Sequence, residues 1–261
     1  MNLKLTGTSA LVCGSTQGIG KASALELASL GARVTLVARN KEKLEAVLGE
    51  LSAGEGQQHD YIVADFDFPD QLQKALAAYR APDATTILVN NTGGPNPGPA
   101  ASASLDQFVS AFNNHLLCNQ VLVQHVLAGM KEKGYGRIIN IISTSVKIPI
   151  NGLGVSNTIR GAVANWSKTL ANELGPFGIT VNNVLPGSTM TGRLEAVMQG
   201  KAKATGKSVN EIKEEMIREI PVRRIAEPYE IAAAVAFLAT PAAGYINGIN
   251  LTVDGGRTGC L

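Results

Sequence analysis

The sequence predicts a doubly wound α/β fold, in which a parallel sheet of about seven strands is covered by helices on both faces. Short β-branched or aliphatic runs alternate along the chain with longer segments of helical periodicity. The strand-like runs are apolar throughout, as expected of strands buried on both sides of a parallel sheet. Because folds of this type often form one domain at a length of 261 residues, we expect a single domain over 1–261.

The expected strands are the short apolar runs bounded by turn-forming residues, and in chain order they cover 9–14, 33–39, 61–66, 85–91, 137–143, 179–187 and 249–256. The expected helices are the amphipathic segments between them, near 18–30, 40–52, 69–80, 105–131 and 155–175. The Pro/Gly-rich piece 93–100 follows a strand, where a loop would meet a ligand crevice. The polar region 188–218 lacks a strand and is expected to form a helical lid; a surface insertion without function is the alternative.

Composition narrows the class of partner and compartment. The formal charge of +2 comes from interspersed signs without a block of like charges, so a nucleic-acid arm is not expected. No apolar run is long enough to span a membrane, and the start of the chain has no secretion-signal pattern. The cysteines Cys13, Cys118 and Cys260 have neither disulfide-framework nor zinc-site spacing, so no metal is expected. We therefore expect a cytoplasmic protein.

The segment CGSTQGIG (13–20) directly follows the first expected strand and opens the first helix. Glycines at three of its positions permit a tight turn and a close approach of the backbone to a pyrophosphate, which the helix N-terminus attracts. This strand–loop–helix context is what the dinucleotide-binding motif of a Rossmann fold requires. The expected cofactor contacts in this loop are Gly14, Ser15, Thr16, Gln17, Gly18, Ile19 and Gly20.

The end of the second strand indicates which dinucleotide is bound. An acidic residue there binds the ribose hydroxyl of NAD, whereas a cation pairs with the 2′-phosphate of NADP. This sequence has Ala38 followed by Arg39, so NADP(H) is favoured over NAD(H). The alternative is that Arg39 is only a solvated residue after a strand.

These motifs resemble, in order and spacing, those of the short-chain dehydrogenases/reductases, most like the branch of 3-oxoacyl-carrier-protein reductases and glucose dehydrogenases. The likeness covers nearly the whole chain. Besides the glycine loop, it includes NNTG (90–93), GRIINIIS (136–143), NNVLPGSTMT (182–191) and the C-terminal segments 221–240 and 246–256. The resemblance implies a homotetramer. It also implies cofactor contacts at Asp65, which would meet the adenine, and at Asn91, Gly93, Arg160, Pro186, Gly187, Thr189 and Thr191.

The catalytic set of this family is Asn, Ser, Tyr and Lys, and only the Ser is clearly present, at Ser143. The usual separation of thirteen residues leads from Ser143 to Ser156 in place of Tyr, and four further to Arg160 in place of Lys. His115 stands where the Asn is expected. A Ser hydroxyl is a much weaker acid than a Tyr phenol, and Arg stays protonated where Lys can relay a proton.

Three hypotheses remain open. In the first, the protein reduces a carbonyl, possibly a 3-oxoacyl group, and another residue gives the proton; His115 and Lys147 are the titratable candidates. Arg160 would then hold the nicotinamide ribose or an anionic group of the substrate and stabilise the developing oxyanion.

In the second hypothesis, the protein binds NADP(H) without turnover, as a sensor or partner subunit. In the third, nucleotide binding is vestigial. Lys201, Lys203 and Lys207 could attract the phosphate of an acyl carrier or of CoA, with solvated lid residues as the alternative.

Overall fold

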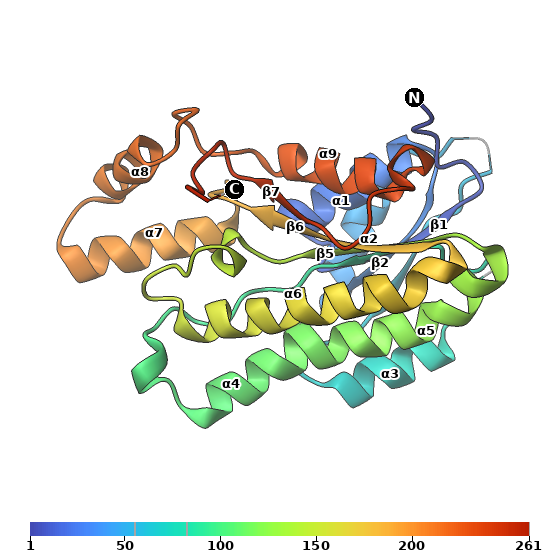
Figure 1. The fold of residues 1–261 in the computed structure, drawn as a ribbon, viewed down its shortest axis with the longest axis horizontal. Coiled ribbons are helices and arrows are strands. Elements are labelled where there is room, and N and C mark those ends of the chain that lie inside the picture. The colour runs from blue at the N-terminus through green and yellow to red at the C-terminus, as the bar shows by residue number, and fades with distance from the viewer. Residues whose placement is uncertain (55, 82, 261) are drawn as a thin grey trace.

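The protein is an α/β sandwich built on one parallel sheet, which we describe from a computed structural model over residues 1–54, 56–81 and 83–260. The seven strands lie in the order β3-β2-β1-β4-β5-β6-β7, and every neighbouring pair is parallel (Figure 1). In chain order the strands are β1 (Ser9–Cys13), β2 (Arg33–Ala38), β3 (Asp60–Val63), β4 (Ile87–Asn90), β5 (Gly136–Ile141), β6 (Ile179–Pro186) and β7 (Asn250–Val253). The doubly wound parallel sheet predicted from the sequence is confirmed.

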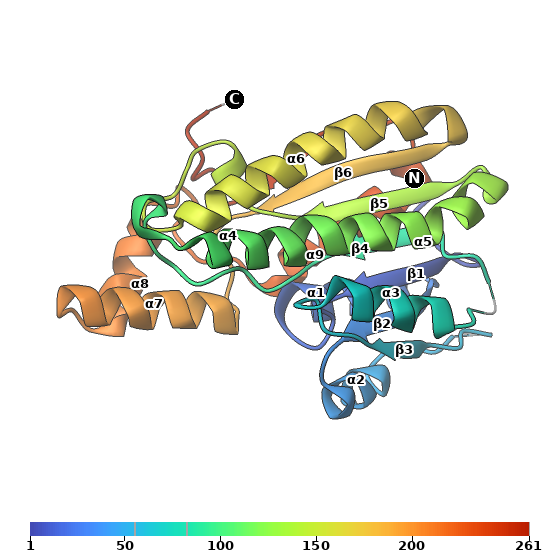
Figure 2. The same ribbon diagram turned by 90° about the horizontal axis from the view of Figure 1, so that it is seen from below.

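Helices cover both faces of the sheet (Figures 1 and 2). One face carries α1 (Gly18–Ser29), α2 (Lys41–Leu48) and α9 (Pro228–Ala239). The other carries α3 (Pro69–Ala78), α4 (Leu105–Phe112), α5 (Cys118–Lys133) and α6 (Gly154–Leu174). No helix in the described part of the chain is both long and apolar enough to cross a bilayer.

The core consists of two apolar layers separated by the sheet. Val12 packs with Leu27 and Val235 in one layer, whereas the preceding residue of the same strand, Leu11, packs with Leu122 in the other. Successive side chains of a strand point to opposite faces, so a strand covered on both sides must be apolar at every position. This explains why the strands read as continuous apolar runs in the sequence.

A row of asparagines crosses the second half of the sheet beneath its apolar cover. Asn90, Asn140, Asn183 and Asn250 are direct cross-strand partners on β4, β5, β6 and β7. Their side-chain amides are linked in turn, at 2.8 Å, 3.0 Å and 2.8 Å. The Asn140 amide also donates to the Ser167 hydroxyl of α6 at 3.2 Å. Buried polar groups of this kind are tolerated because they hydrogen-bond to one another.

The long helix expected at 105–131 exists, but it contains a π-helical segment at Asn113–Leu117 between α4 and α5. The Cys118 N–H bonds to the carbonyl of Asn113, five residues earlier, so one extra residue is inserted into the turn. His115 lies inside this segment and is only 2% exposed. Such insertions occur frequently at functional sites, and periodicity in the sequence gives no sign of them.

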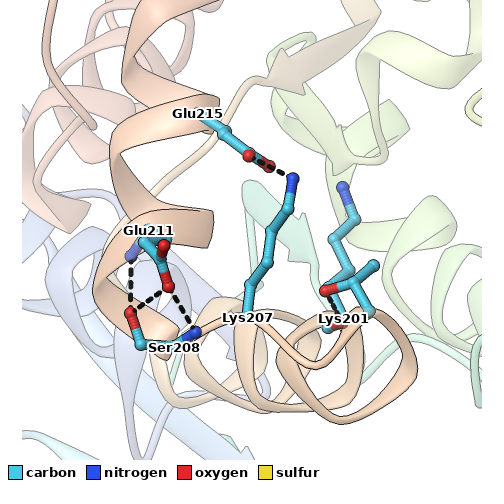
Figure 3. A network of polar contacts seen from close by, with 6 residues as sticks. Lys201, Lys207, Ser208, Glu211 and Glu215 are labelled. Carbon is cyan, nitrogen blue, oxygen red and sulfur yellow. Dashed lines mark hydrogen bonds and ion pairs between the residues drawn. The ribbon is translucent and has the colours of Figure 1, made fainter.

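Two helices, α7 (Gly192–Thr205) and α8 (Val209–Arg218), stand out beyond the carboxyl ends of the strands (Figures 1 and 2). They pack through their own small apolar cluster, which includes Met198, Ile212 and Met216. A Ser208–Glu211 capping box begins α8, and the Lys207 ammonium binds the Glu215 carboxylate at 2.5 Å (Figure 3). The region 188–218 is thus helical, as expected; its role as a lid stays a prediction.

Candidate active site

The loop between β1 and α1 has a backbone that accepts only glycine at key positions. Gly14 and Gly18 have φ angles of 58° and 54°, in the left-handed region that side chains disfavour. A Cβ added to Gly20 would lie 2.2 Å from the carbonyl oxygen of Gly14, which is far inside van der Waals contact. The loop is therefore pressed closely against the first turn of its helix.

Surrounding residues brace this loop and leave its helix N-terminus free. Asn91, just after β4, donates through its amide to the carbonyls of Cys13 and Gly14, both at 3.3 Å. The Ser15 hydroxyl is fully buried and donates to the Val37 carbonyl at 3.4 Å. Gln17, the residue that precedes α1, makes no side-chain cap, so the first N–H groups of the helix remain available to an anion. This arrangement fits the pyrophosphate of a dinucleotide.

Two charged residues lie at the same edge, beyond β2 and β3. Arg39 is exposed and forms no ion pair with any described residue. The Ala64 N–H binds the Ala38 carbonyl at 3.0 Å, which brings the chain before Asp65 alongside the chain before Arg39. The Asp65 carboxylate accepts the N–H of Asp67 at 3.1 Å. These positions are compatible with the expected contacts to the adenosine half of NADP(H).

The turn after β6 meets the glycine loop from the other side. A Cβ on Gly18 would lie 3.1 Å from the Thr191 methyl group, so the two segments are in contact. Thr191 caps α7 by accepting the Leu194 N–H at 3.3 Å. Thr189 is buried and donates to the carbonyl of Gly187 at 3.2 Å. The fold thus brings together the cofactor contacts predicted on both halves of the chain, including Pro186 at the end of β6. Gly93, after β4, has open space around its Cα.

Ser143 lies two residues beyond the end of β5, at the same edge of the sheet. Its hydroxyl accepts the Ser145 N–H at 3.1 Å, which leaves its own hydrogen free to be donated. Ser156 occupies the first turn of α6 and forms no side-chain hydrogen bond with a described residue. Arg160 lies one turn further on and donates to the carbonyl of Ile141 at 2.9 Å, so α6 is tied to the strand that presents Ser143.

Thr92 lies two residues after the end of β4, and its hydroxyl is hydrogen-bonded to Nδ1 of His115. Burial lowers the pKa of His115 well below its ordinary value of 6.5, and the charges of Arg160 and Arg193 lower that pKa further. The ring is therefore neutral at neutral pH. A neutral imidazole can pass a proton from one nitrogen to the other, but it holds no excess proton to give.

Lys147 ends the short 3₁₀ turn Thr144–Val146 that follows Ser143, and its side chain is partly exposed. Within the described ranges it forms neither a side-chain hydrogen bond nor an ion pair. The structure thus leaves the chain with two candidate proton sources of different kinds, a buried neutral ring and a partly solvated ammonium.

Sequence reasoning missed two residues of this site. Thr92 stands where the resembled family has Ala, and it is the hydrogen-bond partner of His115, which stands where that family has Asn. The two departures were visible separately, but their pairing was not. Arg193, the second residue of α7, is partly buried and donates to the Pro95 carbonyl at 2.5 Å. Its position two residues after the Thr191 turn was the available signal.

Comparisons with known proteins agree with this geometry. A family model described as enoyl-(acyl carrier protein) reductase matches residues 14–258. The glucose 1-dehydrogenase of Gluconobacter oxydans is 34% identical over 266 residues, covering 98% of this chain and 93% of the relative. The 3-oxoacyl-[acyl-carrier-protein] reductase FabG of Aquifex aeolicus is 32% identical, covering 98% and 99%. The L-sorbose reductase of Gluconobacter frateurii, solved with NADPH and L-sorbose, is 27% identical, covers both chains completely and superposes with a TM-score of 0.93.

Proposed function

Because the chain belongs to the short-chain dehydrogenase/reductase family of NAD(P)-dependent oxidoreductases, we propose that it is an NADP(H)-dependent reductase of a carbonyl compound with a non-standard proton donor. One observation carries the proposal. The glycine loop with its uncapped helix and the Ser143 hydroxyl lie at one edge of one sheet, and Asn91 and the turn at Thr191 contact the loop at that edge. A vestigial nucleotide site would not need glycine at positions where a Cβ meets backbone.

NADP(H) is favoured by the exposed, unpaired Arg39 after β2, and the solved L-sorbose reductase binds NADPH. The glycine loop would hold the pyrophosphate, while Thr189 would lie toward the nicotinamide side. When bound, NADPH supplies a hydride to the substrate carbon. The chain itself must then place the carbonyl, stabilise the oxyanion and deliver one proton.

The residues after β5 and on α6 can stabilise the oxyanion. The Ser143 hydroxyl has its hydrogen free and can donate it to the substrate oxygen, and Ser156 can donate from the first turn of α6. Arg160 adds a buried positive charge, which is worth more at a site that excludes water than at an exposed one. None of these groups is an acid near pH 7, so the proton must come from elsewhere.

We assign the proton to the Thr92–His115 pair. In this relay the Nε2–H of the neutral imidazole would give its proton to the oxyanion while Nδ1 takes the proton of the Thr92 hydroxyl. The Thr92 oxygen then takes one proton from water, so the ring and the hydroxyl both end neutral. Lys147 is the alternative donor. His115→Ala should abolish turnover and leave NADPH affinity unchanged, whereas Lys147→Met should preserve turnover; the opposite result would assign the proton to Lys147.

The second candidate function is an NADP(H) sensor or partner subunit that does not turn the cofactor over. The observation that favours it is the low pKa of His115, which leaves the site without a buried acid. Calorimetric titration with NADPH and with NADH, followed by a screen of carbonyl compounds for NADPH oxidation, separates the two. Tight NADPH binding with turnover supports the reductase. Tight binding without turnover of any carbonyl or enoyl compound supports the sensor.

The homotetramer implied by the family stays a prediction, and one surface supports it. Leu105, Val109 and Phe112 lie along one side of α4 and are 82%, 57% and 38% exposed. Apolar side chains at this spacing are normally covered in the working protein. Light scattering on the purified protein gives the mass directly, and a monomer at micromolar concentration would remove the expectation.

A further inference from the structure

Two guanidinium groups enter the candidate site without a carboxylate to neutralise them. Arg160 is only 8% exposed, and Arg193 is partly buried. Each donates to a backbone carbonyl, of Ile141 and of Pro95, which carries no net charge. The ion pairs found across the described ranges include neither arginine. The site therefore holds two fixed positive charges and lacks a matching negative one.

Both guanidinium groups are held beside the ends of neighbouring strands, because Arg160 contacts the last residue of β5 and Arg193 contacts Pro95 in the loop after β4. Burial lowers the pKa of Arg160 to about 10, and the charge of Arg193 contributes to that decrease. Both arginines also lower the pKa of His115. Arg193 sits at the start of α7, where the helix dipole is itself positive and makes a cation unfavourable. Partly buried cations in such surroundings are costly unless a partner compensates them.

Two acidic side chains on neighbouring segments, Asp254 and Asp67, have hydrogen-bond partners of their own. Asp254, beside Gly187, accepts the N–H groups of Gly256 and Thr258 at 2.9 Å and 2.7 Å. Asp67 accepts the Asn114 amide at 2.7 Å. Neither carboxylate affects the pKa of Arg160 or Arg193. A bound anion would supply the negative charge that the described acidic residues do not.

The cofactor has its own anion site at the N-terminus of α1 and at Arg39, on the other half of the sheet. Arg160 instead lies against the end of β5, beside Ser143, and Arg193 lies against the loop that follows β4. These segments surround the place where the reducible carbonyl would lie. Arginine binds carboxylates through paired N–H groups. Each of these two side chains uses one of its five N–H groups on a carbonyl of the described chain, which leaves four for a ligand.

We propose that the substrate is an oxo acid, whose carboxylate is bound by Arg160 and Arg193 while its carbonyl group lies at Ser143. The proposal rests on the reductase function for its carbonyl, but the carboxylate site stands independently of turnover. The reaction balances as one hydride from the bound cofactor and one proton added across the carbonyl, which gives a hydroxy acid and oxidised cofactor.

The test uses the unmodified protein saturated with NADP⁺, which binds but cannot reduce. Acetoacetate, levulinate and 2-oxobutyrate are titrated calorimetrically beside their methyl esters, which keep the carbonyl and remove the charge. Each free acid should bind at least roughly tenfold more tightly than its ester. Equal affinity of acid and ester across the set would overturn the proposal. Because this experiment uses the unmodified protein, its outcome does not depend on whether a variant folds.

Variants then identify the arginines. Arg193→Gln keeps a donor for the Pro95 carbonyl and should remove the preference for the acid, while Arg193→Lys should keep most of it. Arg218→Gln removes an exposed charge from the adjacent helix α8 and should change nothing. If Arg193→Gln instead weakens NADPH binding and leaves the acid preference intact, the arginine serves the cofactor and the proposal fails.

Turnover separates this proposal from the reductase itself. Reduction of neutral ketones as efficiently as of the acids would leave the reductase standing and remove the carboxylate site. Binding of the acids over the esters without reduction of any of them would leave the carboxylate site standing and remove the carbonyl reductase.

Discussion

The glycine loop after β1 and the start of α6 lie at the same edge of one sheet, but their residues meet different requirements. Around the loop, backbone geometry fixes the sequence, because a Cβ at Gly20 would collide with the Gly14 carbonyl. Around α6, the requirement is chemical, and side chains can change without disturbing the backbone. Ser156 and Arg160 fit a regular helix as well as Tyr and Lys would. Substitutions around the glycine loop, which we call the cofactor half, are therefore limited by steric contacts with the backbone. Substitutions around Ser143 and α6, which we call the hydride half, can change the chemistry without disturbing the backbone.

The largest effect should come from breaking the steric requirement. Gly20→Val should weaken NADPH binding by roughly a hundredfold or more, about 2.7 kcal/mol, because the side chain displaces the loop. Calorimetry measures the Kd, and circular dichroism checks the fold. Gly200→Ala, on α7, adds a Cβ where nothing lies within 4 Å and should leave binding unchanged. Retained NADPH affinity in the Gly20 variant would show that the loop does not hold the cofactor.

A smaller effect on cofactor binding is expected at Arg39, where the requirement in the cofactor half is for charge and not for space. Arg39→Asp should move preference from NADPH toward NADH by roughly tenfold or more, at about 1.4 kcal/mol per tenfold, because the 2′-phosphate loses its cation and meets an anion. Affinities for both nucleotides give the ratio. Lys43→Asp, at an exposed position in the first turn of α2, is the matched charge reversal and should not alter the ratio. Equal affinity for NADPH and NADH in the unmodified protein would already contradict the assignment.

In the hydride half, acid should destabilise the fold through His115. The folded protein keeps the ring neutral because its pKa is far below 6.5, whereas the unfolded chain binds a proton once the pH falls below about 6.5. Stability should therefore fall with decreasing pH, by up to ~1.4 kcal/mol per pH unit from this group. Urea unfolding between about pH 7 and about pH 5 measures the slope.

The comparison variant for that slope is His115→Asn, which removes the titrating ring and should unfold with a shallower acid dependence. His125→Asn removes a ring whose pKa is lowered by burial alone, so its effect should be smaller. Identical slopes in the unmodified protein and the His115 variant would mean that the ring is charged in the folded state, and the relay through Thr92 would then be wrong.

The smallest effect tests whether the two departures in this half are coupled. Thr92→Ala should cost about 1 kcal/mol of unfolding free energy, the usual value of a hydrogen bond in a buried site. In the Thr92→Ala/His115→Asn double variant, the combined cost should be less than the sum of the two single costs by roughly 0.5–1 kcal/mol. Additive costs would show that the pair formed by chance and does not act as a unit.

The same contrast explains what the sequence could and could not predict. The strands and the tight glycine loop were predictable because local patterns determine them, namely continuous apolar runs and a strand–loop–helix context. The selection of NADP(H) by Arg39 follows from one residue after a strand and stays a prediction. The partnership of Thr92 with His115 was not, because it depends on a π-helical turn that has no periodic signature. Arg193 was not predicted for another reason. It is singled out because it forms no ion pair with a described carboxylate, and the absence of a partner can be recognised only in the three-dimensional structure.

The asparagine row across β4, β5, β6 and β7 fixes the register of these strands. Apolar strands buried on both sides could slide by two residues and still match face to face, but any such slip would separate the buried amides of Asn90, Asn140 and Asn183. The register thereby fixes the positions of the carboxyl ends of β5 and β6, from which Ser143 and the Thr191 turn follow. Loops above that edge can be lengthened, shortened or exchanged without losing alignment, which makes this half of the molecule a suitable platform for redesigning specificity.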